Sequence, residues 1–129
     1  MTSESVDSLK ARFEEELKKY KQLERDNEKN ITNRQQLEGQ LTENNLVKAE
    51  MDLLGVDDVV YKLIGPVLVK QDVAEAKENV NKRIAYIKTE INRLEEIMAD
   101  CKKKHESQKE TLMLAQNQLK QKLSTQQQQ

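Results

Sequence analysis

Apolar residues in the first fifty positions recur with the alternating three- and four-residue spacing of a helix that packs along one stripe. The pattern starts near the N-terminus, turns polar in its middle, and becomes apolar again before residue 54. We therefore expect a helix over 5–54. Its buried stripe is expected to contain Val6, Leu9, Phe13, Tyr20, Leu23, Asn27, Asn30, Arg34, Leu37 and Leu41.

A short stretch rich in β-branched residues interrupts the helical pattern at 59–71. Gly65 and Pro66 divide it, which predicts a β-hairpin closed by a two-residue turn with glycine at positive φ. Gly55 precedes the stretch and is expected to end the helix in the left-handed conformation.

Both faces of this hairpin are apolar except at Lys62, and an isolated two-stranded hairpin is only marginally stable in water. We therefore expect it to join hairpins of other chains in a larger sheet or barrel. The alternative is a hairpin folded back on its own helices. The residues expected to make the assembly contacts are Val59, Val60, Tyr61, Leu63, Ile64, Val67, Leu68 and Val69.

A second helical pattern follows over 72–123, with Asp72 placed as its N-cap. The glutamine-rich residues 124–129 are expected to be disordered. The stripe of this second helix is expected to contain Ile84, Ile87, Ile91, Leu94, Met98, Cys101, His105, Gln108, Leu112, Ala115 and Leu119.

Because a hairpin joins the two helices, they should run antiparallel. The expected pairing places Leu41 near Tyr86 and Phe13 near Leu114, to within about one helical turn. Met113 and Leu114 add apolar surface that a two-helix stripe cannot hide, and such surface marks interaction sites.

Composition supports this plan. Of the 129 residues, 36% are hydrophobic, 3% aromatic and 35% charged, which is too little apolar volume for a thick core. The expected fold is mainly α: a long antiparallel two-helix coiled coil whose helices are joined by a hairpin that assembles with other subunits into a larger sheet or β-barrel. We expect one domain over 1–129.

Charge and candidate chemistry narrow the function. The 22 basic and 23 acidic residues nearly cancel, which argues against nucleic acid, and no apolar run is long enough for a membrane. Cys101 and His105 lie four residues apart and are expected to fill the helix interface rather than to bind metal. We therefore expect no enzyme, no cofactor and no metal. A single cysteine and an N-terminus without an apolar core suggest a soluble intracellular protein and do not separate cytosol from nucleus. Of the two, we expect the cytoplasm.

Two stretches carry a specific sequence signature. Residues 41–54 read LTENNLVKAEMDLL, and residues 60–71 read VYKLIGPVLVKQ. Both stretches resemble the β-type subunits of prefoldin, and among these the eukaryotic subunit 6 class. The likeness is specific across residues 37–94 and compositional elsewhere.

The resemblance implies a heterohexamer of two α-type and four β-type subunits joined through a double β-barrel. Such complexes bind unfolded or nascent polypeptides, notably actin and tubulin, without ATP, and transfer them to the cytosolic group II chaperonin. Partners would thus be other prefoldin subunits, non-native polypeptides and this chaperonin. The alternative is a coiled-coil scaffold or tether for one folded partner. Client-binding candidates, assigned by position along the helices, are Leu9, Phe13, Leu112, Met113, Leu114, Leu119 and Leu123.

Overall fold

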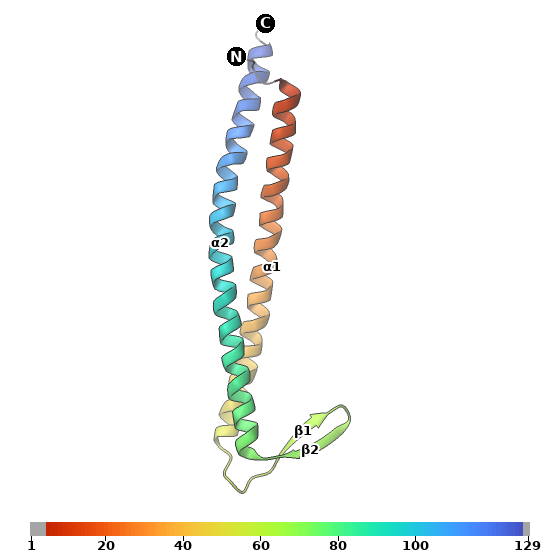
Figure 1. The fold of residues 1–129 in the computed structure, drawn as a ribbon, viewed down its shortest axis with the longest axis vertical. Helices are drawn as coiled ribbons and strands as arrows, with labels where there is room; N and C mark the ends of the chain where they lie inside the picture. Colours follow the sequence, from red (N-terminus) through yellow and green to blue (C-terminus); the bar gives the residue numbers. More distant parts are fainter. Residues whose placement is uncertain (1–4, 128–129) are drawn as a thin grey trace. The chain divides into compact units, whose positions relative to one another are not determined.

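The structure, a computed structural model, describes residues 5–127, and over these residues the elements follow in the order α1, β1, β2, α2 (Figure 1). Helix α1 spans Val6–Asp52, and helix α2 spans Val73–Gln127. Strands β1 (Val60–Ile64) and β2 (Val67–Gln71) form one antiparallel hairpin between them. The expected class, two long helices joined by a β-hairpin, is confirmed.

The chain packs as two compact units. Unit 1 consists of Met1–Ile31 and Glu96–Gln129, and unit 2 consists of Thr32–Glu95. Within each unit a segment of α1 lies beside a segment of α2 and runs in the opposite direction (Figure 1). The hairpin belongs to unit 2.

Contacts between the helices follow the expected pairing. In unit 2, Arg83 Nη1 donates to Asn44 Oδ1 at 3.4 Å, which agrees with the expected neighbourhood of Leu41 and Tyr86. In unit 1, Arg12 Nη1 donates to Gln118 Oε1 at 3.4 Å, about one helical turn from the predicted match of Phe13 with Leu114.

The buried side chains include predicted stripe residues and extend the stripe of α2 toward its start. Unit 2 buries the predicted Ile84 and Ile87 and, outside the predicted stripe, Val73, Ala76 and Val80, each at most 7% exposed. In unit 1 the most buried side chains are Leu9, Cys101 and Ala115. The polar stripe positions Asn27, Asn30 and Arg34 are half-buried, as expected, so the apolar contact of the helices is interrupted there.

Local bonds explain where the helices begin. Ser5 Oγ accepts from the amide of Ser8 at 3.1 Å, which makes Ser5 the N-cap of α1. Helix α2 begins at Val73, and the Asp72 carbonyl accepts from the Ala76 amide at 2.9 Å. Asp72 therefore occupies the predicted N-cap position.

The predicted role of Gly55 is wrong. Helix α1 ends earlier, at Asp52, and tightens through a bond from the Leu54 amide to the Met51 carbonyl of 3.0 Å. Asp58 Oδ2 then accepts from the Gly55 amide at 2.6 Å, so a side chain closes the turn. Gly55 keeps a negative φ, because this closure needs no left-handed residue.

The expected disorder of the tail is also wrong for residues 124–127, which continue α2. Glutamine is a good helix former, and Thr125 Oγ1 donates to the Gln121 carbonyl at 2.8 Å, a bond that helix geometry permits. Residues 128–129 lie outside the described residues.

The hairpin turn matches the prediction. Ile64 pairs with Val67, so Gly65 and Pro66 form a two-residue loop, and Gly65 has φ of 57°. Proline cannot take the positive φ that a type I′ turn needs at its second position, so the loop is of the II′ kind.

Candidate functional site

The hairpin exposes apolar side chains on both faces. Residues paired across antiparallel strands share a face, so Leu63 and Leu68 lie on one face and Ile64 and Val67 on the other. All four are at least 55% exposed. The alternative of a hairpin packed onto its own helices therefore does not hold near the turn, and only Val60 and Gln71 at its base are half-buried.

Both edges of the hairpin also remain open within unit 2. In a hairpin with a two-residue loop, the pair beside the loop exchanges backbone hydrogen bonds, and the next pair directs its amides and carbonyls outward. By this register, Leu63 and Leu68 present backbone groups to the free edges of β1 and β2. Open edges with apolar faces are the features by which one sheet extends onto another.

The hairpin is anchored at its base by polar contacts. Lys77 Nζ on α2 donates to the Leu54 carbonyl at 3.1 Å, and the Asp58 amide donates to the Gly55 carbonyl at 3.1 Å. These bonds fix the path of the loop between α1 and β1. The loop nevertheless leaves Leu53 86% and Val56 97% exposed.

The predicted assembly residues thus lie together in and beside the hairpin of unit 2, on both of its faces. Besides Val60 and the four residues near the turn, the set contains Val59, Tyr61 and Val69. These three side chains are each at least 44% exposed. Sequence reasoning missed Leu46, Leu53 and Val56, which are also exposed in unit 2. Leu46 lies outside the heptad stripe of α1, and this position in the sequence could have predicted its exposure.

The client-binding candidates divide into two groups in unit 1. Met113 and Leu114 are 51% and 59% exposed, and Leu123 is 37% exposed. The remaining candidates face the partner helix: Leu9 is buried, and Phe13, Leu112 and Leu119 are half-buried. The first group is available to a partner as the helices stand, whereas the second requires them to separate.

A polar cluster occupies the helix interface of unit 1. The rings of Tyr20 and His105 stack with centroids 4.6 Å apart, and His105 Nε2 lies 3.8 Å from Glu24 Oε1. The pKa of Tyr20 is raised, mainly by desolvation and to a smaller extent by a hydrogen bond to Glu24 and by the negative charge of Glu24. Cys101 Sγ lies 3.9 Å from the Leu23 carbonyl. These contacts fit the expectation that Cys101 and His105 fill the interface.

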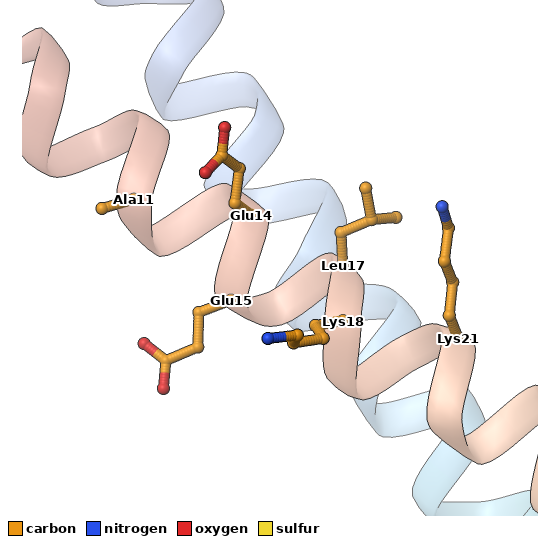
Figure 2. Close-up of a pocket in the computed structure, with 6 residues that line it drawn as sticks. All are labelled: Ala11, Glu14, Glu15, Leu17, Lys18 and Lys21. Carbon is orange, nitrogen blue, oxygen red and sulfur yellow. The ribbon is translucent and has the colours of Figure 1, made fainter.

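One groove of about 520 Å³ runs along α1 in unit 1 (Figure 2). Glu14, Glu15, Lys18 and Lys21 line it with Ala11 and Leu17, and Figure 2 shows their side chains spreading outward rather than converging. Acidic and basic groups balance, so the groove selects no ligand charge. Among residues 5–127 no three His, Cys, Asp or Glu side chains gather in a way that could hold a metal ion.

Over the described residues, neither α1 nor α2 contains a segment long and apolar enough to cross a membrane. The geometry offers exposed apolar side chains and open strand edges, which are features through which polypeptide chains associate.

Comparison with known proteins gives the family. The sequence profile for the prefoldin subunit family matches residues 14–129. The chain is 48% identical to prefoldin subunit 6 of Mus musculus over 104 residues, which are 81% of this chain and 82% of the mouse protein. It is 45% identical to prefoldin subunit 6 of Arabidopsis thaliana over 119 residues, 92% of each chain.

A solved structure has the same fold. The crystal structure of the prefoldin beta subunit from Thermococcus strain KS-1 superposes with a TM-score of 0.72 and 21% sequence identity. The superposition covers 80% of this chain and 90% of the archaeal one. The identity to subunit 6 proteins over most of the chain, together with this fold, confirms the resemblance to the prefoldin β-type subunits and their subunit 6 class. The chain belongs to the prefoldin subunit family.

Proposed function

We propose that this chain is a subunit of a hexameric prefoldin co-chaperone in the cytoplasm. The complex binds unfolded or nascent polypeptides of the actin and tubulin type without ATP and transfers them to the cytosolic chaperonin. The whole chain, 1–129, acts as one prefoldin-type domain, and the family profile over 14–129 supports this.

The observation that carries the proposal is the hairpin with two exposed apolar faces. Leu63 and Leu68 on one face and Ile64 and Val67 on the other have no cover within the described chain. Exposing such a surface in water is unfavourable, at about 25 cal/mol per Å² of apolar area. Partner hairpins of other prefoldin subunits would cover both faces and both edges, and the residues involved would be Val59 to Ile64 and Val67 to Val69.

Client binding is assigned to unit 1. Met113 and Leu114 offer adjacent exposed apolar groups on α2, and Leu123 adds a third. Weak capture of many sequences needs dispersed apolar side chains rather than a shaped pocket, because a pocket would select one client. Leu9, Phe13, Leu112 and Leu119 would add to the surface when the helices of unit 1 separate.

Native mass spectrometry of the tagged chain purified from its host tests the assembly. A complex with five other small subunits is expected. A clean monomer or simple dimer would instead favour a scaffold or tether with one defined folded partner.

Truncation tests the division of labour. A complex whose subunit is shortened to residues 23–104 keeps the hairpin and should still assemble. It should no longer suppress aggregation of denatured actin, because the proposed client-binding residues are gone. Full suppression by the truncated complex would refute the assignment of client binding to unit 1.

A further inference from the structure

Helix α1 carries a second heptad-spaced stripe in unit 2. The stripe that packs against α2 contains the half-buried residues Leu37, Leu41, Asn44 and Met51. Steps of three and four residues also connect another set on the same helix: Gly39, Thr42, Leu46, Ala49 and Leu53. At 3.6 residues per turn the two sets lie on opposite sides of the helix. We call the second set the outer face of α1.

No part of the described chain covers the outer face, and all five of its members are exposed. Leu46 is 63% exposed and Leu53 is 86% exposed. The Leu53 amide donates to the Glu50 carbonyl at 3.2 Å, so the helical turn continues past Asp52 and keeps Leu53 on the side of Leu46. Two leucines held on one side of an ordered helix form an apolar surface that needs little ordering on binding.

Gly39 indicates that the occupant is a helix. Glycine is unfavourable in a helix interior relative to alanine. Nothing in the described chain requires it, because a Cβ at Gly39 would meet no atom within 4 Å and its φ is not positive. A missing side chain is useful where a second backbone approaches closely, since the distance between packed helices depends on the side chains between them. Thr42 donates its hydroxyl to the Glu38 carbonyl at 3.0 Å, which leaves its methyl group for such a contact.

The charges beside the outer face define the chemistry of the partner. Glu43 and Glu50 border it on one side, and neither has an ion-pair partner among residues 5–127. Glu38 borders the other side and pairs with Arg34 of its own helix at 3.2 Å. Lys48 is the only basic residue of 35–61, and its spacing places it with the stripe that packs against α2. The complementary partner is a helix whose apolar stripe is bordered by lysine or arginine.

The outer face is continuous with the hairpin. Leu53 lies seven residues before Val60, where β1 begins, and α2 begins at Val73, two residues after β2 ends. A neighbouring subunit of the same fold that pairs its hairpin with this one would therefore bring the first turns of its own helices close to the end of α1.

We propose that the outer face of α1 binds a helix of a neighbouring subunit in the complex, one whose apolar stripe is bordered by basic side chains. Leu46 and Leu53 would pack between side chains of that helix, and Glu43 and Glu50 would meet its lysines or arginines. One copy of this chain in the complex is sufficient. The inference rests on the proposed assembly and adds to it a contact between helices, outside the β-strands.

Photo-cross-linking in the reconstituted complex identifies the occupant. A benzophenone amino acid replaces Leu46, and we expect it to cross-link to a helical residue of another subunit. The control carries the same group in place of Tyr86, which is 65% exposed on α2 and should not give this product. A product with a hairpin strand or an added client only, or no product at all, would overturn the proposal.

Release of the labelled chain from the complex, chased with excess unlabelled chain, measures the contact. Leu46→Gln/Leu53→Gln should speed release about tenfold or more, because two leucines lose their apolar cover. Glu43→Lys/Glu50→Lys should also speed release, and the control Tyr86→Gln should not. Gly39→Gln separates the two roles of this position: the free chain should melt at a higher temperature, because glutamine is the better helix former, yet it should leave the complex faster.

Far-UV circular dichroism confirms that each variant keeps its helices. Wild-type release rates in the outer-face variants would overturn this contact while leaving the proposed function intact. A Gly39→Gln chain that melts lower on its own would show that the glycine serves the chain itself and would overturn its role in the contact. Failure of the wild-type chain to enter a six-subunit complex would overturn the proposed function together with this contact.

Discussion

The paired substitution Met113→Gln/Leu114→Gln tests the proposed client binding separately from folding. Glutamine keeps the side-chain length and a good helix propensity, so α2 should form as before. Both wild-type side chains are more than half exposed, at 51% and 59%, and they therefore contribute little to the contact between the helices of unit 1. The change should leave the thermal midpoint nearly unaltered.

The expected loss of client affinity follows from those exposures. Full burial of a leucine or methionine contributes about 1.5–3 kcal/mol, so covering the exposed half contributes about 1 kcal/mol for each residue. Together they contribute about 2 kcal/mol, which corresponds to roughly 30-fold in the dissociation constant.

The assay measures aggregation of a client by light scattering. The chemically denatured client is diluted into increasing amounts of the reconstituted complex. The concentration for half-maximal suppression of aggregation should rise by about 30-fold. Ile97→Gln is the matched control, because Ile97 lies on the same helix in unit 1 and is 42% exposed. Equal suppression by the double variant and this control would refute the assignment. A marked fall in thermal midpoint would show that the two residues stabilise the helix pair instead.

Three further predictions concern stability. Ile87→Ala removes a side chain that is only 3% exposed and should lower the free energy of unfolding in urea by about 2–4 kcal/mol. Tyr86→Ala, at a neighbouring residue that is 65% exposed, should change this free energy by about 0.5 kcal/mol or less. Equal effects of the two substitutions would contradict the assigned helix interface. Gly65→Ala meets no atom within 4 Å but must hold φ near 57°, so it should destabilise the hairpin by at least about 1 kcal/mol and lower the thermal midpoint of the assembled complex. The raised pKa of Tyr20 means that the folded chain favours its neutral phenol. This stabilisation is present below pH 10 and is lost as the pH rises through the folded-state pKa. The thermal midpoint should therefore decrease more steeply with increasing alkaline pH for wild type than for Tyr20→Phe.

The helices were predictable from sequence because their signal is repeated many times. Each stripe position from Leu9 to Leu41 adds to the same periodicity, and a few polar interruptions such as Asn27 do not erase it. The antiparallel pairing followed from the hairpin alone. The turn was predictable for a different reason, since only glycine readily takes the positive φ that Gly65 has.

Single-residue features at element ends were less predictable. Gly55 resembles a helix terminator in sequence, but whether α1 ends there depends on Asp58 reaching back to its amide, a contact that periodicity does not encode. The last turn of α2 was missed because glutamine runs suit both a helix and a disordered tail. The burial of individual residues was also hard to predict from the sequence. Leu9 and Met113 are both apolar and near a helix end, yet Leu9 is buried and Met113 is exposed, a difference that depends on packing.

The doubly exposed hairpin also has a consequence for the living cell. A chain whose Leu63, Ile64, Val67 and Leu68 stay uncovered until partners arrive is an aggregation hazard while it is alone. Surplus copies would pair edge to edge with one another or with unrelated strands. If the proposed assembly holds, synthesis of this chain would have to keep pace with synthesis of its partners, and unassembled copies would have to be removed. The surface proposed to build the complex would then also mark any copy left out of it.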